Sequence, residues 1–348
     1  MTVREMVIAS AETELGGRAS GTRIRFAALK DDYLREHPEK GEAEAVLNYA
    51  ERCLDYRAMN KRPPAGLTEL AGEKYAYLFK ADDGELETIC AENRVKAASV
   101  DGEIERATGT GKYYCKICRD SGYVGASGGE QKRCSCFRDI LAEKMEEVSG
   151  LPYTGPGAAE ISFDLYSDRA DPQKYGADES PRKNAIAAYR KGKGFASPDD
   201  PHRLLFITGK VGVGKTRLAS AIGSEAIRNS MLVCYSGVSA LLDSLQNRFF
   251  NSDEEQAAYR TRREFIETAD MLIVDDLGVE NYTDRRFESL ISLLDARSGD
   301  GRKTVVTSNL GLADIADIYG ERLASRFIDR DNTINIRLLG DDLRFVGK

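Results

Sequence analysis

The sequence predicts an α/β protein in which a five-stranded parallel sheet with helices on both faces follows a helical region with a cysteine cluster. Three observations predict this architecture. After Arg203, five short apolar runs alternate with amphipathic segments, as in a parallel sheet with crossover helices. A glycine-rich loop joins the first apolar run to a helical segment. Four of the seven cysteines lie together ahead of these elements.

The composition indicates a globular protein of about two domains. The chain has 348 residues, of which 41% are hydrophobic and 31% are charged. This length accommodates two domains of about 100–200 residues. The formal net charge of −7 excludes a globally basic protein, so any contact with DNA must come from a local basic patch. No apolar run approaches the roughly 18–20 residues that span a bilayer, and the N-terminus has no secretory h-region. We therefore expect a cytoplasmic protein without a membrane segment.

The N-terminal half has helical periodicity and then changes in composition. Apolar residues recur at helical spacing over Ala45–Met59, a second helix is expected over Leu86–Arg106, and Pro63-Pro64 interrupts the pattern between them. A short amphipathic helix should follow the cysteines. We predict a helical region over 1–110, a cysteine module with a short helix over 111–148, a Gly-, Pro-, Asp- and Ser-rich linker and lead-in over 149–202, and the sheet domain over 203–348.

The sheet domain alternates strands and helices. Apolar residues share one helical face over 238–249 and again over 287–294, which predicts two of the crossover helices. The predicted strands are Leu204–Thr208, Met231–Tyr235, Met271–Asp275, Thr304–Thr307 and Thr333–Arg337.

The loop Gly209–Thr216 fits the phosphate-binding pattern G-x-x-x-x-G-K-[ST] and lies between an apolar strand and a helix. Its glycines let backbone N–H groups turn toward phosphate oxygens, and the helix adds its positive end. Lys215 should pair with the β- and γ-phosphates, and the Thr216 hydroxyl should ligate Mg²⁺. A chance glycine-rich turn would not explain the flanking strand and helix. The sequence predicts an ATP site formed by Gly209, Gly212, Val213, Gly214, Lys215, Thr216 and Arg217.

Polar residues follow two later strands, where they could reach the same site. The run Met271–Asp275 continues into a second acid, Asp276. We assign Asp275 to Mg²⁺, together with Thr216, and Asp276 to the attacking water. Asn309 follows Thr304–Thr307 and could reach the γ-phosphate or that water. The alternatives are a solvated acidic turn and a turn-forming asparagine.

The clustered cysteines form the pattern Cys115-x-x-Cys118 followed by Cys134-x-Cys136. Four thiolates can close a tetrahedral structural Zn²⁺ site, and neither histidine lies nearby. The alternatives are free thiols, a redox pair or an iron–sulfur cluster. We expect the other three cysteines, Cys53, Cys90 and Cys234, to be plain buried thiols.

Taken together, these motifs resemble bacterial replicative helicase loaders of the DnaC/DnaI type, which are AAA+ ATPases. The residues that carry the resemblance are Gly209–Thr216, the run Leu272–Gly278 followed by Glu280, Thr307-Ser308-Asn309 and Ser325-Arg326-Phe327. The segment Tyr114–Tyr123 ahead of a Cys-x-Cys pair resembles the DnaI branch. The resemblance extends over about 111–340.

The resemblance implies a fold and a function. It implies the strand order 5-1-4-3-2 and no C-terminal lid, because few residues follow the last strand. It implies that the N-terminal region docks on a hexameric replicative DNA helicase, and that the AAA+ domain binds ATP and single-stranded DNA. Arg326, with Arg322 as second candidate, would be an arginine finger acting on the nucleotide of a neighbouring copy; the alternative is a solvated surface arginine. Many AAA+ proteins have Glu at the position of Asp276, so we expect hydrolysis to be slow or to need a partner.

A single-strand site requires basic and aromatic residues. Such residues lie between the second and third strands, where related initiators place a DNA-contacting insertion: Arg248, Phe250, Arg260, Arg262 and Arg263. The alternative is an ordinary helical hairpin, because Phe249 falls on the apolar face and the acids Asp253, Glu254 and Glu255 interleave.

Three other functions stay open. A transposition helper ATPase of the IstB type shares the Asp-Asp-Leu-Gly run, although residues 1–137 argue against it. A nucleotide-dependent adaptor with negligible hydrolysis is compatible with Asp276. A small-molecule kinase is disfavoured by Asn309 and Arg326 and by the lack of an acceptor-binding motif.

Overall fold

The computed structural model describes residues 1–59, 75–125, 131–246, 252–278 and 284–345. The chain divides into two compact units. The sheet unit comprises Met1–Glu12 and Phe137–Lys348, and the helical unit comprises Thr13–Cys136. Within the described residues, no helix has both the length and the apolar character that a bilayer crossing requires.

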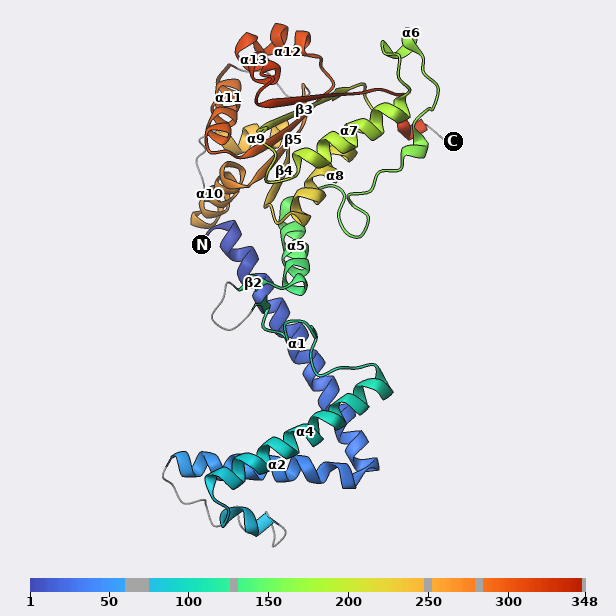
Figure 1. Cartoon of the computed structure of the whole chain (residues 1–348). Helices are drawn as coiled ribbons and strands as arrows, with labels where there is room; N and C mark the ends of the chain where they lie inside the picture. Colours follow the sequence, from blue (N-terminus) through green and yellow to red (C-terminus); the bar gives the residue numbers. More distant parts are fainter. Residues whose placement is uncertain (60–74, 126–130, 247–251, 279–283, 346–348) are drawn as a thin grey trace. The chain divides into compact units, whose positions relative to one another are not determined.

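The sheet unit is built on five parallel strands (Figure 1). Their order across the sheet is β4 (Val233–Gly237), β5 (Met271–Leu277), β6 (Lys303–Ser308), β3 (Leu204–Gly209) and β7 (Thr333–Leu338). Numbered along the chain, this order is 2-3-4-1-5, which is the predicted order 5-1-4-3-2 viewed from the other edge. The prediction of strand order is therefore confirmed.

The central strands are buried on both faces, as their sequences require. Leu204–Ile207 and Met271–Val274 are near-continuous apolar runs, and all of these residues are buried. A strand without apolar/polar alternation must be covered on both sides, which a parallel sheet achieves with its crossover helices. The helices of this part of the chain are α8 (Lys215–Arg228), α9 (Val238–Leu245), α10 (Asp253–Thr268), α11 (Asp284–Gly299), α12 (Leu312–Tyr319) and α13 (Glu321–Ile328).

The longest helix of the stretch 149–202 was not predicted. Helix α7 (Pro181–Phe195) lies within the stretch 149–202, for which we expected a linker and lead-in. Its buried face includes Ala185, Ala188 and Phe195, and it packs against α8 so closely that a Cβ on Gly192 would lie 2.4 Å from the Ile222 side chain. The small residues that permit this packing are also those that weaken the apolar periodicity in the sequence. The same stretch forms η2 (Phe163–Leu165) and α6 (Pro172–Tyr175), and the segment after β7 forms η3 (Leu343–Phe345).

The described residues of the helical unit form several small clusters of buried side chains. Helix α2 (Pro38–Ala58) packs against α4 (Asp83–Thr108) and η1 (Ala76–Phe79). Helix α1 (Val3–Glu36) begins in the sheet unit and continues into the helical unit, and α5 (Ser135–Ser149) begins at the end of the helical unit. The predicted helix over 45–59 falls within α2 except for Met59, its C-cap, and that over 86–106 falls within α4, whereas the Pro63-Pro64 interruption lies outside the described residues. Cys53, Cys90 and Cys234 are buried free thiols, as predicted, and burial raises the pKa of each.

Candidate functional site

The loop Gly209–Thr216 curls between β3 and α8 in a conformation that only glycine adopts easily. Gly209, Gly212 and Gly214 have φ angles of +153°, +75° and +98°. At Gly209 there is also no room for a side chain, since a Cβ would lie 2.7 Å from the Leu338 carbonyl oxygen. Helix α8 starts directly at Lys215, so its unpaired N–H groups face the loop. This is the geometry of an anion-binding helix terminus.

Lys215 is buried at the base of this loop, with 5% of its surface exposed. Its Nζ donates to the carbonyl oxygens of Gly209 and Lys210, both at 3.0 Å, and to Oδ1 of Asn309 at 2.5 Å. Burial lowers the pKa of Lys215, while the charges of Asp276 and Asp275 oppose this shift. The structure thus brings the loop lysine together with the polar residue predicted at the end of β6.

Asp275 lies near the carboxyl end of β5, beside the loop, and is almost completely buried. Its Oδ2 accepts hydrogen bonds from Thr216 Oγ1 at 2.9 Å and from Tyr235 Oη at 2.7 Å. Its Oδ1 accepts from Thr307 Oγ1 at 2.5 Å. Thr216 and Asp275, assigned to one Mg²⁺ from the sequence, are therefore in direct contact. A hydroxyl and a carboxylate are oxygen ligands that suit this hard cation.

Asp276 has a backbone conformation that L-residues rarely adopt. Its φ angle is +60°, and the pairing of β5 with β6 shifts register between Val274 and Leu277. Its N–H donates to Thr307 Oγ1 at 2.9 Å, which holds this conformation. Burial raises the pKa of the Asp276 carboxyl, Asp275 raises it further, and Lys215 opposes the shift. Strained residues of this kind cost about 1–3 kcal/mol and cluster at functional sites.

Two segments outside the sequence motifs contact the backbone of the phosphate loop. The Tyr166 hydroxyl donates to the Val213 carbonyl oxygen at 3.0 Å, and burial raises the pKa of Tyr166 to about 12. The N–H of Leu343 donates to the Gly212 carbonyl oxygen at 3.0 Å. Tyr166 lies in the expected linker, where nothing in the sequence indicated a contact with the loop.

Arg217 was predicted to bind ATP, but its guanidinium forms hydrogen bonds within the protein. The group donates to the carbonyl oxygens of Gly157 (3.3 Å) and Glu160 (2.5 Å) and lies 4.6 Å from the ring centre of Tyr153. This arginine therefore anchors the 153–160 segment to α8. Val213, also predicted for the site, has a fully buried side chain.

The arginine-finger candidates lie on α13 and pair with acids of α11. Arg326 makes a bidentate ion pair with Asp295, with distances of 3.0 and 2.9 Å, and Arg322 contacts Glu288 at 3.1 Å. The pair raises the pKa of Arg326 and lowers that of Asp295. Within one chain, the described partners of Arg326 do not include the phosphate loop.

Of the five candidate DNA contacts, Arg248 and Phe250 lie outside the described residues. The other three are on α10. Arg260 is exposed, Arg262 donates to the Tyr235 carbonyl oxygen at 3.1 Å, and Arg263 pairs with Glu267 at 2.9 Å.

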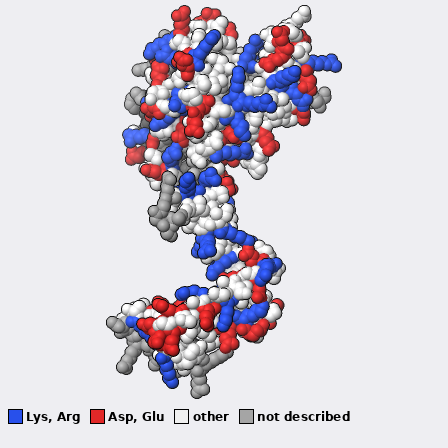
Figure 2. Space-filling model, viewed as in Figure 1, with Lys and Arg blue, Asp and Glu red and all other residues white. Residues whose placement is uncertain are grey.

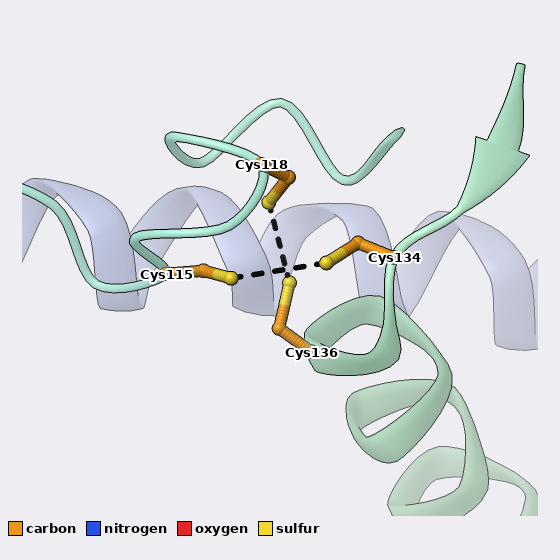
Figure 3. A group of neighbouring side chains, drawn as sticks. All are labelled: Cys115, Cys118, Cys134 and Cys136. Carbon is orange, nitrogen blue, oxygen red and sulfur yellow. Dashed lines mark hydrogen bonds between the residues drawn. The ribbon is translucent and has the colours of Figure 1, made fainter. Parts of the chain in front are cut away.

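The four clustered cysteines converge in the helical unit (Figure 3). Their sulfur atoms all lie within 4.8 Å of one another, with Cys115 and Cys134 3.8 Å apart and Cys118 and Cys136 3.5 Å apart. Tetrahedral Zn²⁺, with Zn–S bonds of about 2.3 Å, separates its sulfur ligands by about 3.8 Å. A sharp turn after Cys118, with positive φ at Arg119 and Asp120, folds the first pair toward the second. The donor set therefore fits zinc.

Part of the sheet unit is similar to known proteins. Residues 199–335 match the family model described as IstB-like ATP binding protein. The chain is 28% identical over 198 residues to the replicative helicase loader DnaC of Buchnera aphidicola subsp. Acyrthosiphon pisum (strain APS), covering 55% of this chain and 73% of that protein. It is 27% identical over 203 residues to the replicative helicase loader DnaC of Escherichia coli (strain K12), covering 57% and 75%.

A solved structure of DnaI matches with a TM-score of 0.38 and 21% identity, over 54% of this chain and 100% of that chain. The family match begins just ahead of the strand that enters the phosphate loop and ends within β7, so it contains Lys215, Asp275 and Asn309. By the family match and the two DnaC relatives, residues 199–335 form an IstB/DnaC-like ATP-binding domain.

Proposed function

We propose that this protein is an ATP-dependent loader that places a hexameric replicative DNA helicase on single-stranded DNA during replication initiation. The observation that carries the proposal is the similarity, over more than half of the chain, to two proteins named replicative helicase loader. The separate helical unit supports it, because a loader needs a docking module besides its ATP-binding domain. Residues 1–110 would supply that module.

The direct test is the native mass of a mixture of the full chain with the replicative helicase of the same organism, with and without ATP. We expect a stable complex whose amount or stoichiometry changes with ATP. A chain lacking residues 13–136 should fail to join it, while retaining ATP binding. Absence of a complex under every nucleotide condition would contradict the loader function and leave the ATP site unaffected.

In the proposed ATP site, the chain's own residues divide the work. Thr216 and Asp275 would hold Mg²⁺, which neutralises charge on the β- and γ-phosphates. Lys215 would exchange its carbonyl partners for phosphate oxygens, since a buried ammonium gains most from an anionic partner. Asp276, turned by its positive φ, would accept a proton from the attacking water, and Asn309 would orient that water. Gly209, Gly212 and Gly214 would admit the phosphates to the backbone N–H groups.

Lys215→Ala should abolish ATP binding, with the affinity reduced about a hundredfold or more, because the substitution removes the charged partner of two phosphates. Equilibrium titration with a fluorescent ATP analogue measures the affinity. Lys191→Ala, which removes an exposed lysine of α7, is the control and should bind normally. Normal affinity of the Lys215 variant would refute the site.

The four cysteines would hold a structural Zn²⁺ that stabilises the helical unit, whose described residues form small apolar clusters. Metal analysis should find about one zinc per chain. Cys134→Ser should lose the metal, whereas Cys234→Ala, a buried thiol of the sheet unit, should keep it. Iron with visible absorption, or no metal in freshly reduced protein, would favour the cluster or redox alternatives instead.

Arg326 would act on the nucleotide of a second copy, leaving its ion pair with Asp295. Arg326→Ala should therefore retain ATP binding but lose the hydrolysis that depends on assembly. The ion pair is partly exposed, so its loss should cost no more than about 1 kcal/mol of stability. Arg330→Ala, a nearby exposed arginine, is the control. Unchanged turnover of the assembled Arg326 variant would remove the finger role.

A single-strand contact is proposed for α10 and the neighbouring Arg248 and Phe250. In Figure 2 acidic and basic side chains are interspersed over the visible face of the sheet unit, so binding would rely on a few local cations. Arg260 is the most accessible of the described candidates, since Arg262 and Arg263 have partners within the protein. A normal affinity of Arg260→Glu for an oligonucleotide at low salt would argue against this surface.

The second candidate function is a transposition helper ATPase. The description of the matching family model as IstB-like favours it. If the full chain bound a transposase rather than a helicase, the result would support the transposition helper function. An adaptor with negligible hydrolysis would instead bind ATP without measurable turnover in any assembly.

A further inference from the structure

Tyr235 contacts the proposed metal ligand although it belongs to none of the nucleotide-binding motifs. It lies on β4 and pairs in register with Ile273 of β5. Residues two apart on a strand share a face, so Tyr235, Ile273 and Asp275 point to the same side of the sheet. The diagonal between Tyr235 and Asp275 is within reach of a long aromatic side chain. The phenol oxygen of Tyr235 reaches Asp275 across this diagonal and donates a hydrogen bond of 2.7 Å to Oδ2.

This hydrogen bond completes the set of donors around the carboxylate. Asp275 accepts from Thr216 and Tyr235 on Oδ2 and from Thr307 on Oδ1. An ionised carboxylate has about four acceptor positions, so three are already taken by hydroxyl groups from three different elements. The carboxylate is therefore fixed in rotation, and its remaining acceptor position is fixed with it.

Tyr235 is itself held in place. Its strand is paired with β5 along the whole length of β4, and its carbonyl oxygen accepts a hydrogen bond from Arg262 of α10 at 3.1 Å. The phenol is half-buried, so it is shielded in part from competition by water. A hydroxyl fixed in this way can orient a neighbouring ligand without any rearrangement when a cation arrives.

We propose that Tyr235 is a positioning residue for Mg²⁺ binding, which holds the Asp275 carboxylate in the orientation that receives the cation beside Thr216. The proposal rests on the ATP site described above. Hydrogen-bond partners of metal ligands set both the orientation and the affinity of a site, and their removal weakens metal binding about 10- to 100-fold. Thr307 cannot replace Tyr235, because it donates to the other carboxylate oxygen.

The test is Tyr235→Phe, which removes one hydroxyl and keeps the ring. ATP binding is measured at equilibrium across a Mg²⁺ titration and again in EDTA. We expect the Mg²⁺ concentration for half-maximal effect to rise about tenfold, with the affinity for metal-free ATP unchanged. A loss of folding would instead weaken binding under both conditions.

Tyr189→Phe is the matched control. Tyr189 is also half-buried, and its hydroxyl donates to the Ala159 carbonyl oxygen at 3.0 Å rather than to a site residue. Its Mg²⁺ dependence should equal that of the unmodified protein. Unmodified protein whose ATP binding is independent of Mg²⁺ would contradict the proposed ATP site. If the unmodified protein depends on Mg²⁺ but Tyr235→Phe changes the half-maximal Mg²⁺ concentration by less than twofold, the role of Tyr235 is wrong and the ATP site stands. The same holds if Tyr235→Phe loses ATP binding equally in EDTA.

Discussion

The pairing of β6 between β3 and β5 is the constraint on which the candidate site depends. All three strands run parallel, so their carboxyl ends meet at one edge of the sheet. This brings Lys215, Asp275 and Asn309 together although they are far apart in sequence. A sheet with β3 next to β5 would leave no place for Asn309 beside the loop lysine. The strand order therefore determines which residues meet at the site, and the side-chain contacts set their detailed geometry.

The site contains charged groups that are buried. Hydrogen bonds within the sheet unit offset the loss of water around each of them. Lys215 is surrounded by carbonyl oxygens, and Asp275 by hydroxyl groups. At the start of β6, the guanidinium of the buried Arg297 donates to the carbonyl oxygens of Ile266, Glu267 and Lys303 and to the Thr304 hydroxyl. Burial lowers the pKa of Arg297 to about 10. Buried charges are tolerated where hydrogen bonds replace those to water, and here backbone carbonyl groups and side chains both supply those bonds.

The two units differ in how they achieve stability. The sheet unit has one large core that extends across both faces of the sheet. The helical unit has small separate clusters, one of which consists of the cysteines with Val124. Small modules of this kind commonly need a covalent or metal crosslink, and four converging thiols provide the means. The cysteine cluster therefore has a structural explanation that is independent of any partner.

Sequence alone determined the parts of this protein that depend on local backbone geometry and periodic burial. The phosphate loop, the strand ending in Asp275 and Asp276, and the cysteine pairs were all identified by spacing, because each requires particular residue types within a few positions. Tertiary structure decided the rest. The contacts of Tyr235, Tyr166 and Arg217 join segments that are distant in the chain. Helix α7 was missed because small residues, Ala185, Ala188 and Gly192, make up most of its contact face. A side chain that bonds a distant carbonyl or carboxylate needs no periodic pattern, so it leaves no trace in one sequence.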